Sequence, residues 1–446
     1  MKHSRVATKL SSFAKSGQQS MKYSCQFICQ TNPLFIQLTY FTLISFAGYE
    51  ALKVLKSQDK SNTMKDLDLL FTSVSASTVS SMATVEMEDF SSTQLWILAI
   101  LMLIGSEVFT SILGLHFMRV KFNTEKPANK SDRSSHVDIE SINAANFDPS
   151  PSQGTEVTVP SSQLCLANKE HVDPKTIKFL GTVVMAYLLI TNLGSLLLIY
   201  IYLKLVPDAQ EVLKRKGIGN FLFSVFTAIS SVANCGFTPV NENMVIFQKN
   251  SILLLLIIPQ ILAGNTLFAP CLRYMVWTFK KITGKEECHF ILQHPKAIGC
   301  RHLMSTRKCV YLVVTVVSFI ILQTILFCSL EWSSEALQEM SSYEKIVGAL
   351  FQSTNARHAG ESVVDLSSVS SAITVLYTVM IAYGNVGFSV GYSCKRLLKH
   401  DVYCKDASYG FVGKWSDKGK LILIVVMVFG RLKTFNLKGG SAWKLR

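Results

Sequence analysis

Long apolar stretches constrain this chain most strongly, because few folds can keep them away from water. Five clear stretches lie at about 33–52, 94–117, 176–203, 251–278 and 309–330, and a less clear one lies at 420–436. Each is long enough to cross about 30 Å of hydrocarbon as an α-helix, or nearly so. With 49% hydrophobic residues, the chain also has more apolar material than a soluble core needs. The stretches therefore predict an all-α polytopic membrane protein.

Basic residues gather at the ends of these stretches. The chain carries 44 Lys and Arg against 30 Asp and Glu, a formal net charge of +14. An excess of Lys and Arg marks the cytoplasmic ends of membrane helices. We therefore expect cytoplasmic N- and C-termini, and we expect no nucleic-acid partner. No small-residue cleavage pattern follows the first apolar stretch, so no removable signal peptide is expected.

Polar segments divide the chain into repeats. Residues 122–175 are rich in Ser and Pro without a sustained period, which predicts a flexible cytoplasmic linker. The expected order is a cytoplasmic N-terminus at 1–32, a first repeat at 33–121, the linker at 122–175, a second repeat at 176–282, a cytoplasmic connection at 283–308, a third repeat at 309–376, and a fourth pore loop with the last inner helix at 377–446.

Four shorter segments, rich in Ser, Thr, Asn and Gly, resemble one another. They read "FTSVSASTVSSM" from Phe71, "FTAISSVANCGF" from Phe226, "LFQSTNARHAGE" from Leu350 and "YTVMIAYGNVGF" from Tyr377. Ten residues after these starts lie Ser81, Gly236, Gly360 and Gly387. Irregular backbone at membrane depth is tolerated only where protein or a water-filled path satisfies it. Rings of backbone carbonyls can replace the hydration shell of a cation, so the four segments predict a pore with four re-entrant loops.

The same segments resemble the loops of the plant HKT family, relatives of the bacterial and fungal Trk/Ktr cation transporters. The likeness runs from about residue 33 to the C-terminus, apart from the linker. It implies a pseudo-fourfold pore in which each loop supplies one selectivity-filter residue. Carried over by position, the filter residues are Ser81, Gly236, Gly360 and Gly387, flanked by Ser80, Asn234, Cys235, Asn385 and Val386. No catalytic motif is visible, and we expect neither an enzyme nor a bound cofactor.

In that family, a serine at the first filter position accompanies sodium-selective transport, whereas a glycine accompanies mixed or coupled transport of sodium and potassium. Ser81 therefore implies a passive Na⁺ transporter of the plasma membrane. A coupled Na⁺/K⁺ transporter and a non-conducting isoform that acts through interaction are the alternatives. Monovalent cations and the lipid bilayer are the expected partners, and homo-oligomerisation is left open.

Several charged residues and cysteines allow two interpretations each. Arg431 and Lys433, in the last apolar stretch, resemble an electrostatic barrier below the filter, or they mark a helix end that reaches the cytoplasm. Glu107 either lies near the pore or bonds within the bundle. Acidic residues after the first and third loops, which are Glu86, Glu88, Asp89 and Glu361, either concentrate cations at an outer mouth or form solvated loops. Cys394 and Cys404 fall in an outer loop, where a disulfide is permitted.

The chain departs from the family pattern between the third and fourth loops. Only sixteen residues, 361–376, separate Gly360 from Tyr377. Two spanning helices need about 40 residues. We therefore expect the third inner helix and the fourth outer helix to be missing, with "SSAITVLYTVMIAY" as the fourth pore helix. This predicts six membrane crossings in place of the eight that the family pattern implies.

Overall fold

The computed structural model is α-helical, and its described part contains no β-strand. The described residues are 33–55, 64–128, 174–295, 298, 300, 302–334, 337–366, 368–384, 386–387, 391 and 408–436. They belong to two compact units. Of the described residues, the first unit includes those within 113–182 and 276–301, and the second includes those within 31–112, 183–275 and 302–446. All four predicted filter positions belong to the second unit.

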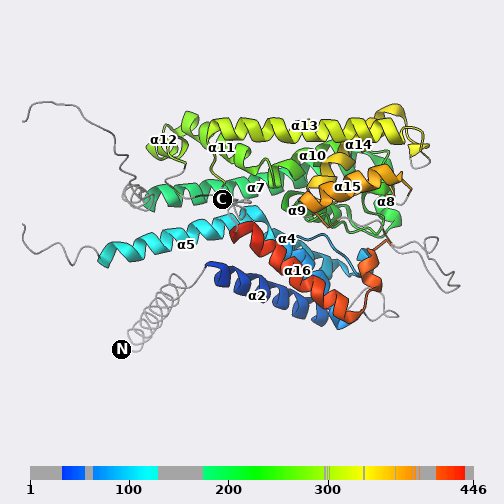
Figure 1. Ribbon diagram of the computed structural model, residues 1–446, viewed down its shortest axis with the longest axis horizontal. Coiled ribbons are helices and arrows are strands. Elements are labelled where there is room, and N and C mark those ends of the chain that lie inside the picture. The colour runs from blue at the N-terminus through cyan, green and yellow to red at the C-terminus, as the bar shows by residue number, and fades with distance from the viewer. Residues whose placement is uncertain are drawn as a thin grey trace, which may run out of the picture. The chain divides into compact units, whose positions relative to one another are not determined.

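The helices run along the chain as follows (Figure 1). The first repeat contains α2 (Pro33–Val54), α3 (Asp66–Thr78), α4 (Ser92–Gly105) and α5 (Glu107–Ala128), and the second contains α7 (Pro174–Leu205), α8 (Pro207–Arg215), α9 (Asn220–Ala233), α10 (Ser251–Gly264) and α11 (Phe268–Thr283). After α12 (Glu286–Gln293) come α13 (Thr306–Glu331), α14 (Ser342–Arg357), α15 (Ser371–Gly384) and α16 (Asp417–Asn436). Short 3₁₀ turns lie at Met87–Asp89 (η1), Asn243–Phe247 (η2) and Phe411–Lys414 (η5).

Local sequence explains where two of these helices begin. Ser91 precedes α4, and its hydroxyl accepts a hydrogen bond from the Gln94 amide while the Gln94 side chain accepts one from the Ser91 amide. Ser341 and Glu344 form the same reciprocal pair at the start of α14. Such a capping box satisfies backbone donors that the first turn of a helix leaves unpaired. The serine three residues before a Gln or Glu is a start signal that can be read from the sequence alone.

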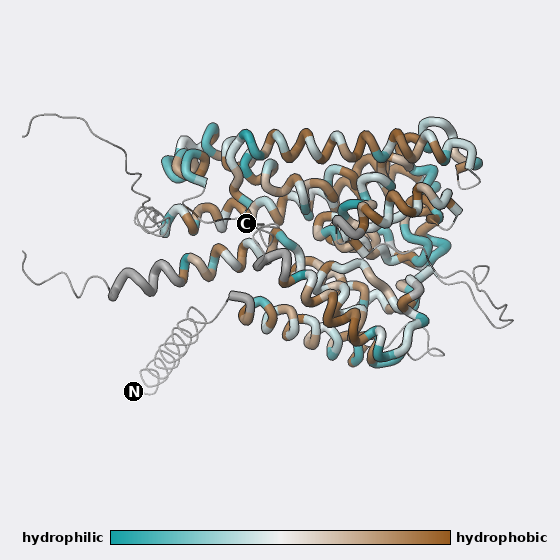
Figure 2. Tube along the Cα trace, viewed as in Figure 1, coloured by the Kyte–Doolittle hydropathy of each residue, from teal (hydrophilic) through white to brown (hydrophobic). Residues whose placement is uncertain are grey.

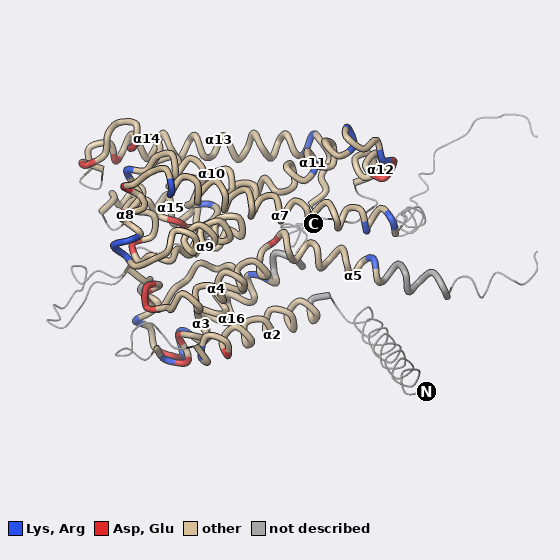
Figure 3. Tube along the Cα trace, turned by 180° about the vertical axis from the view of Figure 1, so that it is seen from behind, with Lys and Arg blue, Asp and Glu red and all other residues tan. Residues whose placement is uncertain are grey.

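Apolar residues make up much of the long helices (Figure 2). On α13, Val314, Ile321 and Ile325 are each more than half exposed. The charged residues of α13 lie at its two ends, Arg307 and Lys308 at one and Glu331 at the other, and its middle carries none (Figure 3). An exposed apolar surface of this extent has no favourable contact with water, so it fits a helix that faces lipid.

Among the described residues, two helices, α7 and α13, are long and apolar enough to cross a membrane unbroken. The predicted stretches at 94–117 and 251–278 are bent instead. The chain turns by 52° between α4 and α5 and by 85° between α10 and α11. The apolar length predicted these two stretches but not the bends within them, because apolarity does not report where a helix breaks. Whether six segments cross the bilayer stays a prediction.

Within the second unit, the pore helices pack between the longer ones. Helix α3 packs on α2, α4 and α16, while α9 packs on α4 and α10. Helix α14 packs on α10, α13 and α15. Helix α2 also packs on α4 and on α16 (Figure 1). Helix α15 has 14 residues, or about 21 Å of length, which is shorter than the hydrocarbon layer.

Candidate functional site

The first two pore helices end in the same way. The residues that follow α3 and α9, Val79 and Asn234, both adopt the left-handed conformation, with φ of 57° and 59°. The next amide in each loop, of Ser80 or Cys235, donates to the carbonyl five residues earlier at 2.9 Å. This is the pattern of a left-handed helix cap, which satisfies carbonyls at the end of a helix. The two loops therefore leave their helices in the same direction.

The fourth loop shares part of this ending. The Val386 amide donates to the Ile381 carbonyl at 3.1 Å, again five residues back. The third loop differs by one residue, because the amide that makes this bond is that of Gly360 itself, with Asn355 as acceptor at 3.1 Å. Each loop thus turns sharply just before, or at, the position that the ten-residue spacing predicts.

Three of the four predicted filter residues have positive φ. The values are 61° for Ser81, 75° for Gly236 and 94° for Gly360. Glycine adopts this region without strain, whereas a residue with a Cβ is disfavoured there. Ser81 therefore has the backbone conformation that glycine provides in the second and third loops. The serine retains this conformation despite its side chain.

The structure brings the four predicted filter positions together. A Cβ on Gly236 would overlap the Ala359 carbonyl and lie 2.7 Å from the Ser81 hydroxyl oxygen. A Cβ on Gly360 would lie 3.2 Å from the same hydroxyl and 3.4 Å from the Gly387 carbonyl oxygen. A Cβ on Gly387 would overlap the Ser80 carbonyl. Glycine is thus required by close backbone approach at Gly236 and Gly387, and the Ser81 hydroxyl lies beside both Gly236 and Gly360.

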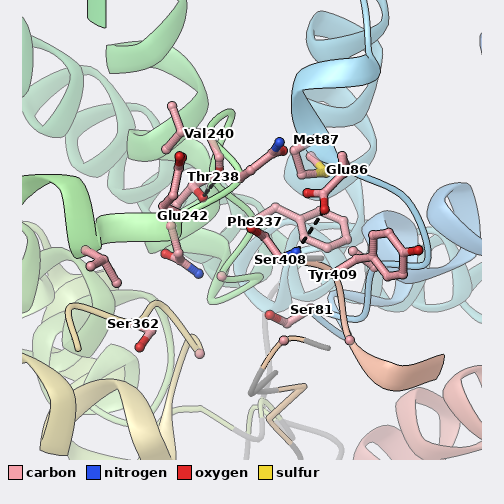
Figure 4. Close-up of a pocket in the computed structure, with 18 of the residues that line it drawn as sticks. Ser81, Glu86, Met87, Phe237, Thr238, Val240, Glu242, Ser362, Ser408 and Tyr409 are labelled. Carbon is pink, nitrogen blue, oxygen red and sulfur yellow. Dashed lines mark hydrogen bonds between the residues drawn. The ribbon is translucent and has the colours of Figure 1, made fainter. Parts of the chain in front are cut away.

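All four residues line one cavity of about 440 Å³. Figure 4 shows Ser81 at its base, with Phe237 above it. Acidic and hydroxyl side chains line the wider part, among them Glu86, Glu242, Asp365, Ser362 and Ser408. A cavity lined in part by these polar groups and in part by apolar side chains leads to the loops, and a hydrated cation needs such a space in order to approach them.

The acidic residues around the cavity have different environments. The Glu86 carboxylate accepts a hydrogen bond from the Ser408 amide at 2.8 Å (Figure 4). Burial raises its pKa, an effect that the Ser408 amide partly offsets. Glu88 and Glu242 share Lys216, whose Nζ lies 3.0 Å and 2.5 Å from their carboxylates. Glu88 also exchanges two hydrogen bonds with Asn241. Of the side chains just considered, Glu86 lines the cavity without a lysine partner at hydrogen-bond distance.

Glu361 does not lie at the outer mouth as a solvated acidic group. Its side chain is fully buried, and Oε1 accepts a hydrogen bond from the Ser231 hydroxyl at 2.8 Å. Its burial rules out the solvated loop, whereas an effect of its charge on cations stays a prediction. The sequence could not show its burial, because Ser231 lies 130 residues earlier in the chain.

The flanking residues of the proposed filter have structural partners. The Ser80 hydroxyl shares a hydrogen bond with the Thr78 hydroxyl at 2.7 Å. The Asn234 side chain donates to the Ile261 carbonyl at 2.9 Å, and Cys235 is fully buried. A Val386 methyl lies 2.9 Å from the position of a Cβ on Gly360. Asn385 lies outside the described residues, as do Cys394 and Cys404, so their predicted disulfide stays a prediction.

Two glycines that sequence reasoning missed support the loops from behind. A Cβ on Gly105, the last residue of α4, would overlap the Ser77 carbonyl, and one on Gly264, the last of α10, would overlap the Val232 carbonyl. Ser77 and Val232 both stand four residues before their filter positions. In both repeats the inner helix therefore breaks where it crosses the end of the pore helix. The signal was present in the sequence as a glycine followed by Ser or Asn.

Arg431 lies at the first of these breaks. Its guanidinium donates to the Gly105 carbonyl, which the break leaves without a helical partner, and it lies 5.9 Å from the centre of the Phe41 ring. Glu107, just past the break, is 3.7 Å from His302 Nε2. The side chain of Lys433 is outside the described part of the chain. Arg431 thus has a partner within the bundle, while its predicted electrostatic effect on the pore stays a prediction.

Comparison with known proteins points to one family. Residues 159–398 match the family described as TrkH, cation transport protein. The chain is 63% identical to "Cation transporter HKT1;3" of Oryza sativa subsp. japonica, over 99% of this chain and 97% of the relative. It is 41% identical to "Sodium transporter HKT1" of Arabidopsis thaliana, over 89% and 92%. The solved structure of the potassium transporter TrkH from Vibrio parahaemolyticus shares the fold with a TM-score of 0.51 and 13% identity, covering 91% of this chain and 84% of that one.

The first of these alignments also shows that the relative is longer. The alignment has 514 positions. The aligned 99% of this 446-residue chain fills about 442 of them. About 70 positions of the relative therefore have no counterpart here. Two missing helices and their connection would account for most of them, at about 20 residues a helix.

Proposed function

The chain belongs to the TrkH family of cation transport proteins and, within it, to the plant HKT transporters, and from this premise we propose that it carries Na⁺ passively across the plasma membrane. The path runs through a filter made by Ser81, Gly236, Gly360 and Gly387. Both chain termini lie on the cytoplasmic side. The observation that carries the proposal is the convergence of these four residues at the base of one polar cavity.

In this proposal, backbone carbonyl oxygens bind the cation. A cation that leaves water loses favourable contacts with its hydration shell, and carbonyl oxygens aimed at the pathway replace them. The Ala359 carbonyl approaches Gly236 closely and the Ser80 carbonyl approaches Gly387 closely, while the Gly387 carbonyl is in ordinary contact range of Gly360. The left-handed backbone at three positions turns these loops so that successive carbonyls follow the pathway.

Ser81 supports the preference for sodium. Its hydroxyl oxygen lies 2.7 Å from the position of a Cβ on Gly236 and 3.2 Å from that of a Cβ on Gly360. A side chain in one quarter of the ring narrows the path and adds a hydroxyl dipole. Both changes disturb a symmetric cage of the size that the larger potassium ion needs. The name of the Arabidopsis relative, a sodium transporter, agrees with this direction.

Sodium currents in oocytes that express this 446-residue chain would test the proposal. We expect an inward current carried by Na⁺ and a reversal potential that follows the external Na⁺ concentration. Ser81→Gly should raise the permeability of K⁺ relative to Na⁺. Ser81→Ala keeps the Cβ and removes the hydroxyl, so it shows which of the two groups affects the permeability. An unchanged permeability ratio in Ser81→Gly would disprove the proposed role of the serine.

The alternative is a form that reaches the membrane without conducting. It is favoured by the roughly 70 positions of the rice relative that have no counterpart in this chain. Surface labelling of the same oocytes distinguishes the two. Full surface delivery without current would support the non-conducting form, which we would then expect to change the current of a co-expressed full-length relative.

A further inference from the structure

The third loop lacks the supports that hold the first two. Helix α14 ends at Arg357, and the residue after it, His358, has φ −117° and ψ −83° in place of a left-handed cap. In the first two repeats, a glycine of the inner helix packs against the pore helix four residues before the filter position. The third repeat has only ten residues between Gly360 and the start of α15, which leaves no room for such a helix. Another contact must hold Gly360 in place.

His358 makes one such contact. It is buried, and its Nδ1 lies 2.8 Å from the Thr354 carbonyl, which can only accept a hydrogen bond. Nδ1 therefore carries the proton, and Nε2 is left to accept from the Thr266 hydroxyl at 3.0 Å. Thr266 belongs to the break between α10 and α11. The histidine thus connects the third loop to the inner helix of the second repeat.

Glu361 makes a second contact on the other side of Gly360. Its amide donates to the Asn355 side chain at 3.1 Å, and its Oε1 accepts from Ser231 on the second pore helix at 2.8 Å. Its Oε2 has no hydrogen-bond partner in the described part of the chain. A buried carboxylate with one unpaired oxygen is unfavourable by itself. The burial of Glu361 is explained if its hydrogen bond to Ser231 holds the third loop in place.

We propose that His358 and Glu361 are positioning residues of the cation site: through Thr266 and Ser231 of the second repeat, they hold the third loop so that Gly360 faces Ser81, Gly236 and Gly387. This inference rests on the proposed filter. It explains how a repeat that lacks its inner helix still presents its filter residue. The support comes from side chains of the neighbouring repeat, which the shortening of the chain leaves intact.

Stabilisation by Na⁺ provides a test that does not depend on conduction. A cation that binds the folded protein raises its unfolding temperature according to its concentration and affinity. We would measure the unfolding temperature of the purified chain in detergent while Na⁺ replaces an organic cation at constant ionic strength. Ser231→Ala, Glu361→Ala and Thr266→Val should each raise the half-saturating Na⁺ concentration about tenfold, because each removes one hydrogen bond that orders the loop.

Two matched variants show whether the Na⁺ response depends on the hydrogen bond of Glu361 or on its charge. Glu361→Gln keeps an oxygen that accepts from Ser231, so it should retain an Na⁺ response close to that of the wild-type chain. Ser224→Ala is the control: Ser224 is buried on the same helix as Ser231, but its hydroxyl donates to Asn220 of its own helix at 2.7 Å. It should leave the half-saturating concentration unchanged.

The outcomes separate this inference from the proposed function. An unchanged Na⁺ response in Ser231→Ala and Thr266→Val would overturn the positioning role, whether or not the chain conducts. Equal losses in Glu361→Gln and Glu361→Ala would overturn it in favour of a role for charge. The absence of any Na⁺ response in the wild-type chain would overturn it together with the cation site. A normal Na⁺ response without oocyte current would contradict only the proposed conduction.

Discussion

Lys420 on α16 forms a buried ion pair with Asp68 on α3, with Nζ 2.6 Å from Oδ1. The two residues are 352 positions apart, and their side chains are only 5% and 9% exposed. The pair joins the last helix of the chain to the first pore helix. It therefore connects the fourth repeat to the first at the boundary where the chain itself provides no link.

Removing one partner of this pair should destabilise the protein strongly. Lys420→Met leaves Asp68 buried without a counter-charge, which costs about 3–5 kcal/mol. The double variant Lys420→Met with Asp68→Leu should recover most of that loss, because two apolar side chains need no counter-charge. Thermal unfolding in detergent measures both effects. Lys53→Met is the matched control, since Lys53 on α2 and Asp66 on α3 form an exposed pair that should contribute little.

Replacing Ser81 by glycine should stabilise the first loop as well as change selectivity. The left-handed backbone at φ 61° disfavours a residue with a Cβ by about 1–2 kcal/mol, and glycine removes this strain. Ser81→Gly should therefore unfold at a higher temperature than the wild-type chain, and Ser81→Ala should not. A lower unfolding temperature for Ser81→Gly would indicate that the hydroxyl contributes more than the strain costs.

The two glycines behind the pore helices should not tolerate alanine. A Cβ at Gly105 or Gly264 meets a backbone carbonyl of the adjacent pore helix, which cannot move aside as a flexible side chain does. Each substitution should cost about 1–3 kcal/mol and reduce delivery to the cell surface. Gly430→Ala on α16 is the control, because a Cβ there meets no atom within 4 Å. Equal surface delivery of all three variants would contradict the proposed packing role.

Glu86 should give the current a dependence on pH and on salt. Burial raises the pKa of its carboxyl, so it gains a proton at a higher pH than an exposed glutamate when the medium is acidified. Protonation removes a negative charge from the wall of the cavity and lowers the local cation concentration. The current at low ionic strength should therefore fall as the external pH decreases.

Glu86→Gln should abolish most of that pH dependence and lower the current at neutral pH. The difference from the wild-type chain should shrink as ionic strength rises, because salt screens the charge. Lys216→Gln should raise the current at neutral pH, since it leaves Glu88 and Glu242 without their shared counter-charge. A pH dependence that persists in Glu86→Gln would assign the titration to another group.

Much of the site could be predicted because the loops share one length. Ser81, Gly236, Gly360 and Gly387 each lie ten residues after the aromatic or apolar residue with which their segments align. The pore helices range from 13 to 16 residues, so this shared spacing indicated the four positions only together with the resemblance to the HKT loops. Apolar length likewise indicated the helical membrane architecture, because hydrocarbon thickness sets the number of residues that a crossing requires.

The sequence by itself determined the helices, their order and the four residues that converge, since these follow from periodicity, spacing and apolar length within short segments. Only the tertiary structure decided that α4 and α10 break against the pore helices, that Ser81 is held in a glycine conformation, and that Glu361 is buried against Ser231. Those features depend on contacts between segments far apart in the chain. Local pattern cannot specify them, because the partner that satisfies a carbonyl or a carboxylate is chosen by packing.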